Sequence, residues 1–153
     1  MRKTDTLILF AIAALALVRL VAIAITPLGL DVEEAQYWLW STTPDAGYFT
    51  KPPMIAWVIG AGTAIFGDSS FGVRALAPII QAISTLLIWR LTRDAFTPQA
   101  GRWAAVIWMT LPAGALGGFI ISTDSPMILF MLSALVVLAP LARQQRLSPM
   151  ACL

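Results

Sequence analysis

The stretch "LILFAIAALALVRLVAIAI", residues 7–25, decides the fold class of this 153-residue chain. It carries one charged residue, Arg19, and is close to the roughly 20 apolar residues that a helix needs to cross a bilayer. Arg2 and Lys3 precede it, as they would in a signal peptide. No persuasive small-residue cleavage site stands before Pro27, so we expect a retained membrane anchor.

The composition extends this expectation to the whole chain. Hydrophobic residues make up 59% of it and charged residues 12%, with a mean hydropathy of +0.82, which is too apolar for a soluble domain. The sequence therefore predicts an all-α, polytopic membrane protein with spans at about 7–26, 74–91, 101–119 and 125–142. The apolar run 54–66 is short for a span, which favours an interfacial or re-entrant helix.

The basic residues predict the orientation of these spans. Seven lie on the N-terminal side of the membrane, and two lie on the other side. The first group is Arg2, Lys3, Arg90, Arg93, Arg102, Arg143 and Arg146, and the second is Lys51 and Arg74. The positive-inside rule then places the N-terminus in the cytoplasm. The loop 27–73 and the turn 121–126 emerge together on the non-cytoplasmic face, where their acids can share one site.

The loop between the first two spans concentrates polar chemistry. Residues 30–53, "LDVEEAQYWLWSTTPDAGYFTKPP", carry four acids and Lys51. We expect a short helix over 33–40, followed by an extended segment that presents Lys51 before a rigid proline pair. Helix capping by Asp31 and Asp124 and interfacial anchoring of Lys51 would explain the same residues without chemistry.

Several exclusions narrow the function. The net charge of +2 and the scattered basic residues argue against a nucleic-acid partner. The chain has no histidine, which removes the commonest general base and zinc ligand. A small four-helix transporter or channel subunit acting as an oligomer is the alternative, but it predicts ionisable residues at mid-membrane on several helices, and Arg19 alone qualifies.

Four motifs in order carry a specific resemblance. "DVEEAQYWLW" (31–40), "GYFTKPPMIAW" (47–57), "FGDSSFGVRALAP" (66–78) and "ISTDSP" (121–126) are similar to the N-terminal portion of polyprenyl-phosphate-sugar-dependent glycosyltransferases of the GT-C superfamily. This superfamily includes the protein O-mannosyltransferases and the lipid A aminoarabinose transferase. Such enzymes are usually several times longer, so we expect residues 1–153 to form one transmembrane domain at the N-terminus of a larger enzyme.

The resemblance implies a reaction and its setting. The enzymes transfer a hexosyl or pentosyl group, with inversion, from a polyprenyl-phosphate donor to an acceptor lipid, cell-wall glycan or protein. The expected location is the bacterial inner membrane, with the active loop on the periplasmic or extracellular side. A carboxylate would remove the proton of the acceptor hydroxyl, and a cation would stabilise the charge of the phosphate leaving group.

The resemblance also implies roles for particular residues. Glu33 aligns with the key acid of the family and is the favoured catalytic base. Asp31 follows closely, because positions two apart share a face on an extended segment. Asp124 matches a second family acid. No cofactor is certain, although a divalent metal held by these three carboxylates stays open.

The substrate-binding candidates come from the same motifs. Lys51 matches the lysine that contacts the lipid phosphate in the family, and Arg74 is its assistant. Glu34 lies beside the favoured base, and Tyr48 is placed to stack on a sugar ring.

Overall fold

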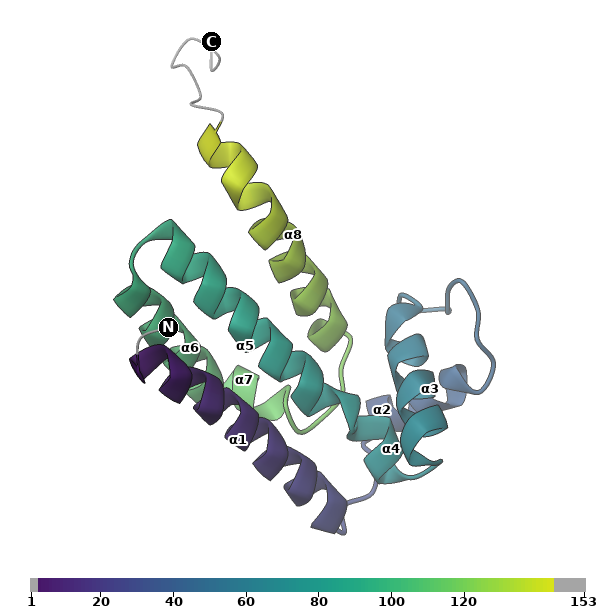
Figure 1. Cartoon of the computed structure of the whole chain (residues 1–153). Coiled ribbons are helices and arrows are strands. Elements are labelled where there is room, and N and C mark those ends of the chain that lie inside the picture. Colours follow the sequence, from purple (N-terminus) through teal and green to yellow (C-terminus); the bar gives the residue numbers. More distant parts are fainter. Residues whose placement is uncertain (1–2, 145–153) are drawn as a thin grey trace, which may run out of the picture.

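The computed structural model describes residues 3–144, and these residues form helices without strands (Figure 1). The helices are α1 (Lys3–Ile25), α2 (Val32–Ser41), α3 (Met54–Phe66), α4 (Ser70–Arg74), α5 (Leu76–Ala95), α6 (Pro98–Thr110), α7 (Pro112–Leu116) and α8 (Asp124–Gln144). The predicted all-α fold is confirmed, as are the short helix after Asp31 and the helix over 54–66. Arg2 and Arg146, which entered the predicted orientation, lie outside the described residues.

Helix α5 is the centre of the bundle. It packs against α1, α6 and α8, and Figure 1 shows α1 and α6 running alongside it. The chain reverses between α5 and α6 in a two-residue connection. Thr97 ends this connection as an N-cap, because its side chain accepts a hydrogen bond from the Ala100 N–H at 3.1 Å, and Pro98 follows in the first turn, where its missing N–H costs nothing. Helices α2, α3 and α4 gather beside the end of α5 at which α8 begins (Figure 1).

Two helical segments are long and apolar enough to cross a membrane. They are Lys3–Ile25 and the segment Ser70–Ala95, which joins α4 to α5. Helix α1 exposes large apolar side chains such as Phe10 and Ile25, at 70% and 77%, as a helix in contact with lipid does. Helix α3 and residues Asp124–Pro140 of α8 are shorter apolar helices.

The expected single helix over 101–119 is wrong, because the chain breaks it. Helix α6 ends at Thr110, and Leu111 has φ −61° and ψ 139°, an extended conformation. The cause is Pro112, whose ring clashes with a preceding residue in the α conformation. The chain continues as the five-residue α7, followed by a turn at Gly117 and Gly118.

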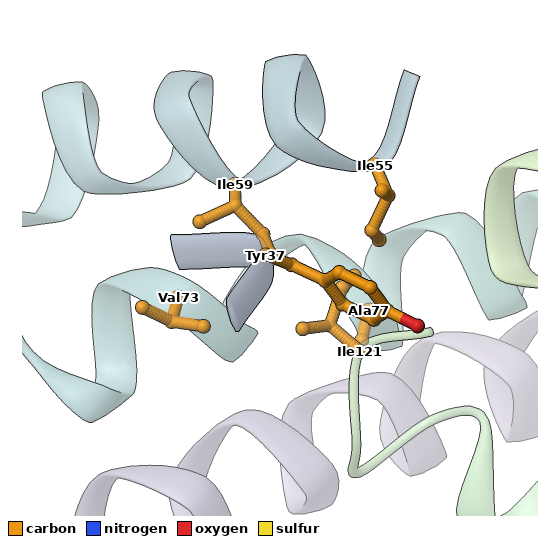
Figure 2. Close-up of a cluster of buried hydrophobic side chains, with 6 residues drawn as sticks. All are labelled: Tyr37, Ile55, Ile59, Val73, Ala77 and Ile121. Carbon is orange, nitrogen blue, oxygen red and sulfur yellow. The ribbon is translucent and has the colours of Figure 1, made fainter. Parts of the chain in front are cut away.

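A hydrophobic cluster attaches the first loop to the bundle. Figure 2 shows its six buried side chains, which come from α2, α3, α4, α5 and the segment before α8. They are Tyr37, Ile55, Ile59, Val73, Ala77 and Ile121. Tyr37 is fully buried at the centre. The loop helices are therefore fixed to the end of α5 instead of lying free on the membrane surface.

Helices α3 and α4 meet at a contact that only glycine allows. A Cβ atom on Gly72 would lie 2.0 Å from the carbonyl oxygen of Gly67, and one on Gly62 would lie 2.5 Å from the carbonyl oxygen of Gly72. Both obstacles are backbone atoms, which cannot move aside as a flexible side chain can. Gly67 also has φ +89°, a conformation that other residues rarely adopt.

We expect Gly72→Ala to lower the free energy of unfolding by about 1–3 kcal/mol, because the added methyl group forces the two helices apart. Thermal unfolding of the purified chain in detergent measures the change. Gly29→Ala is the matched control, since a Cβ there meets nothing within 4 Å. Equal unfolding midpoints for the two variants would contradict the close contact.

Candidate active site

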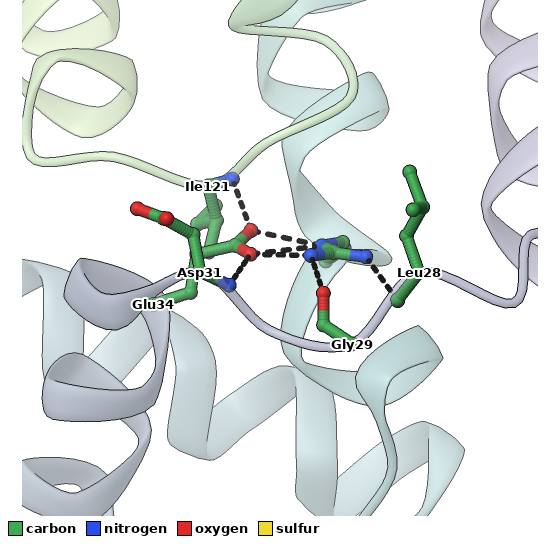
Figure 3. Close-up of polar contacts among 6 residues, drawn as sticks. Leu28, Gly29, Asp31, Glu34 and Ile121 are labelled. Carbon is green, nitrogen blue, oxygen red and sulfur yellow. Dashed lines mark hydrogen bonds and ion pairs between the residues drawn. The ribbon is translucent and has the colours of Figure 1, made fainter.

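A buried ion pair joins the first loop to the second span. The Arg74 Nε donates to both carboxylate oxygens of Glu34, at 2.9 and 3.1 Å, and Nη2 donates to Oε2 at 2.5 Å. The remaining Arg74 donors bind the carbonyl oxygens of Leu28 and Gly29, at 3.1 and 2.7 Å. Dashed lines in Figure 3 mark these contacts at the labelled Glu34, Leu28 and Gly29. The side chains of Arg74 and Glu34 are 4% and 1% exposed.

The Glu34 carboxylate also organises two backbone segments. Its Oε2 accepts from the Asp31 N–H at 3.0 Å, which fixes the start of α2. Its Oε1 accepts from the Ile121 N–H at 3.2 Å, which brings the segment before α8 against the loop (Figure 3). Asp124 stands three residues after Ile121. The ion pair therefore sets the distance between α2 and the N-terminus of α8.

These contacts change the roles expected for Glu34 and Arg74. Both were predicted to bind substrate, but both charged groups are buried and form hydrogen bonds with protein atoms. A substrate would have to displace them and leave a buried charge unpaired, which is costly. The geometry places Glu34 and Arg74 in the framework of the site and not on its surface.

Glu33, the neighbouring residue, faces the other way. It is exposed, and its Oε2 accepts a hydrogen bond from the Tyr37 hydroxyl at 3.0 Å. Residues four apart share a helix face, which explains the pairing. The Lys51 Nζ lies 5.9 Å from the centroid of the Tyr37 ring. Tyr37 thus connects the predicted base to the predicted phosphate-binding lysine, a role that the sequence reasoning missed although the spacing contained the signal.

Asp124 interacts electrostatically with Lys51, as Glu33 and Tyr37 do. Polar contact with Tyr37 is the largest cause that raises the pKa of the Lys51 ammonium. The negative charges of Glu33 and Asp124 act in the same direction. Burial, followed by the hydrogen bond to Glu33, raises the pKa of the Tyr37 hydroxyl. At neutral pH the site therefore holds a cationic Lys51 and a phenol that keeps its proton.

Asp31 has a different place from the one expected. Helix α2 begins at Val32, so Asp31 and Glu33 do not lie on one extended segment. Asp31 is the N-cap, and its carboxylate points away from the ion pair in Figure 3. The negative charge of Asp31 interacts electrostatically with Arg74, whereas that of Glu33 interacts with Lys51. The prediction that Asp31 shares a face with Glu33 is wrong, because the helix starts one residue earlier than Glu33.

Tyr48 helps to shape the loop. Its ring stacks on Trp40 with centroids 4.9 Å apart and an interplanar angle of 8°. Its hydroxyl donates to the Trp40 carbonyl oxygen at 2.9 Å and accepts from the Asp45 N–H at 3.1 Å. One face of the ring is therefore occupied by protein, and stacking of a sugar on Tyr48 stays a prediction.

The three acids proposed as metal ligands do not lie close enough together to bind one ion. Among residues 3–144, no three histidine, cysteine, aspartate or glutamate side chains lie close enough to hold an ion. Asp31 faces Arg74, whereas Glu33 and Asp124 act on Lys51. The residues present do not fit a metal site made of Asp31, Glu33 and Asp124.

Two cavities flank the charged group. One, of about 200 Å³, has mainly apolar walls that include Pro52, Met54 and Phe130. It begins one residue after Lys51. The other, of about 290 Å³, is lined by Asp124 and by residues of α5, α6, α7 and α8. The first cavity is lined by neighbours of Lys51 and of Asp124 in the sequence, and the second is lined by Asp124 itself.

The hydrogen bond between Tyr37 and Glu33, the nearby Lys51 and an apolar cavity are the main features of the candidate site. Comparison with known proteins identifies the family of the chain. A family profile described as dolichyl-phosphate-mannose-protein mannosyltransferase matches residues 50–152. This match covers more than half of the chain, which therefore belongs to that family. No solved structure matches the chain significantly.

Curated relatives come from bacteria. A lipid A galacturonosyltransferase of Rhizobium johnstonii is 39% identical over 106 residues, which cover 69% of this chain and 22% of the relative. An undecaprenyl phosphate-alpha-4-amino-4-deoxy-L-arabinose arabinosyl transferase of Pseudomonas fluorescens is 38% identical over 73 residues, or 46% of this chain and 12% of the relative. The corresponding Pseudomonas aeruginosa transferase is 44% identical over 46 residues, or 30% and 8%. The matches thus cover less than a quarter of these relatives.

We expect Glu34→Gln to lower the free energy of unfolding by about 3–5 kcal/mol, because Arg74 would stay buried without a counter-charge. Asp94→Asn is the control. Asp94 pairs with Arg93 at 2.9 Å on the surface, where their side chains are 48% and 36% exposed, respectively, and such a pair contributes about 0–1 kcal/mol. Denaturant titration in mixed micelles, followed by circular dichroism, compares the two. Similar losses would contradict the framework role of the ion pair.

Proposed function

We propose that the protein carrying this chain transfers a sugar from a polyprenyl-phosphate donor to an acceptor at the non-cytoplasmic face of the bacterial inner membrane. One observation supports the proposal: the Tyr37 hydroxyl donates to the Glu33 Oε2 at 3.0 Å, and the Lys51 Nζ lies 5.9 Å from the centroid of the same ring. Membership of the mannosyltransferase family supports the reaction class. We also propose that residues 1–153 act as the N-terminal transmembrane part of a larger enzyme.

The chemistry follows from the charges. The acceptor oxygen forms a bond to the anomeric carbon, and its proton passes to Glu33 as general base. The bond between the anomeric carbon and the phosphate oxygen breaks, and its electron pair stays on the phosphate. Lys51 neutralises the negative charge that develops there. The Tyr37 hydroxyl orients Glu33, and the Tyr37 ring lies near Lys51. Tyr37 would therefore fix the position of the base relative to the cation.

The donor lipid needs an apolar place next to the cation. The cavity lined by Pro52, Met54 and Phe130 supplies this place. Thr123, the residue before Asp124, also lines it, so the cavity lies next to the proposed site. A phosphate at Lys51 would leave the first isoprene units of the lipid in this cavity. Two prolines directly follow Lys51 and restrict the backbone at the start of α3. They would hold the lysine beside the cavity that takes the lipid chain.

The names of the relatives narrow the choice of substrates. The lipid A galacturonosyltransferase and the aminoarabinose transferases suggest a galacturonic acid or an aminoarabinose donor, with lipid A as the acceptor. We propose lipid A first, ahead of a cell-wall glycan or a protein. The proposed orientation keeps the N-terminus in the cytoplasm. At that end, Arg102 of α6 and Asp5 of α1 pair at 3.3 Å.

We expect Glu33→Gln to lower kcat by about 10²–10⁴-fold, the usual contribution of a general base. Lys51→Ala should lower kcat/KM by about 10²–10³-fold, as loss of a group that stabilises an oxyanion does. The protein carrying this chain is reconstituted in liposomes with undecaprenyl-phosphate-linked aminoarabinose or galacturonic acid and with lipid A. Sugar transfer is followed by mass spectrometry.

Asp45→Asn is the matched control, because Asp45 is an exposed acid of the same loop whose Oδ1 accepts from the Ala46 N–H. It should transfer sugar at the rate of the unmodified protein. Asp31→Asn separates the two candidate bases. A full loss in Asp31→Asn with activity retained in Glu33→Gln would move the base to Asp31. Undiminished transfer in Glu33→Gln, Asp31→Asn and Lys51→Ala would refute a catalytic role for the loop.

A further inference from the structure

We propose that the cavity between α5, α6, α7 and the start of α8 binds one hydroxylated sugar ring, with Gln81 and Trp108 as its hydrogen-bond donors. This inference rests on the proposed function and assigns a substrate subsite within it. The cavity measures about 290 Å³, near the lower end of the ~300–1,000 Å³ range of small-molecule sites. That size suits a single monosaccharide.

Two buried N–H groups at this cavity have no partner. Gln81 is 5% exposed, and its Nε2 makes no hydrogen bond with the described residues. The Trp108 Nε1 is buried and unpartnered in the same way. Both residues line the cavity. Because buried polar groups are nearly always hydrogen-bonded, these two donors call for acceptor oxygens on whatever occupies the space.

Glycines of α7 and its following turn make room for the Gln81 amide. A Cβ atom on Gly114 would lie 3.1 Å from the Gln81 Nε2 and 2.2 Å from the Trp108 carbonyl oxygen. One on Gly117 would lie 3.9 Å from the Gln81 Oε1. The break at Pro112 turns these glycines toward α5. Ala113, Leu116 and Gly117 of this segment line the cavity.

The lining selects the chemistry of the ligand. The amide and indole N–H groups need oxygen acceptors, and the Asp124 carboxylate, which also lines the cavity, can accept from a donor. Sugar hydroxyls supply both, and the apolar walls that include Leu116 and Ile128 match the apolar face of a ring. An isoprenoid chain would leave both donors unpaired. The Asp124 charge disfavours a phosphate.

The position of the cavity ties it to the reaction. Asp124 lines it and also acts on Lys51, so a ring held here lies beside the charged group. Both substrates can supply such a ring, because the donor sugar and a glycan acceptor share hydroxyl chemistry. Binding of a simple glycoside tests the subsite, and steady-state kinetics then distinguish the two sources.

The binding test uses the protein carrying this chain in lipid nanodiscs and saturation-transfer difference NMR with methyl glycosides of galacturonic acid, 4-amino-4-deoxy-L-arabinose and N-acetylglucosamine. We expect at least one glycoside to bind, and Gln81→Leu and Trp108→Phe each to weaken it about fivefold, as loss of one hydrogen bond does. Ser84→Ala and Trp89→Phe are matched controls. Each removes another buried, unpartnered polar atom from a residue that does not line the cavity, and binding should not change.

The outcomes separate this inference from the proposed function. Glycoside binding that is absent, or that is equal in Gln81→Leu, Trp108→Phe and the controls, overturns the subsite even if the reconstituted protein transfers sugar. Binding that depends on Gln81 and Trp108 supports the subsite even if transfer fails. In the transfer assay, Gln81→Leu should raise the KM of one substrate. A raised donor KM assigns the ring to the donor, and a raised acceptor KM assigns it to the acceptor.

Discussion

The buried pair of Glu34 and Arg74 is the interaction on which the rest of the site depends. It joins α2 to α4 across 40 residues of chain, and the same carboxylate holds the backbone at Ile121, 87 residues away. A carboxylate in such a place is tolerated only when its oxygens are paired. Four N–H groups donate to the Glu34 carboxylate, and two backbone carbonyl oxygens accept from Arg74. The loop therefore has one arrangement on the bundle and not several.

This arrangement divides two adjacent acids between structure and chemistry. Successive residues of a helix point about 100° apart, so when Glu34 faces the core its neighbour Glu33 faces outward. Tyr37, one turn further along, belongs to both sides: its ring fills the core of the loop and its hydroxyl binds Glu33. The stability of the loop and the position of the base are therefore coupled through one side chain.

The break in the third apolar segment has a comparable effect on the other side of the site. A continuous helix over 101–119 would carry the chain past the bundle end, whereas Pro112 and the glycines after it fold α7 back against α5. The result is a cavity with the Gln81 amide and the Trp108 indole at its wall. A second cavity, with mainly apolar walls, is lined by residues next to Lys51 and Asp124 in the sequence. Two such cavities suit the proposed substrate, which is part lipid and part sugar.

Sequence alone determined the fold class, the helices over 54–66 and after Asp31, and the candidates Glu33, Lys51 and Asp124, because hydropathy, helix signals and motif order are local properties. It did not determine the partner of Glu34 or the separation of Asp31 from Glu33. Tertiary structure decided these, since a buried charge chooses its partner by packing, and Arg74 lies 40 residues away. The break after α6 and the unpaired amide of Gln81 likewise acquire meaning only when α5, α7 and α8 are packed together.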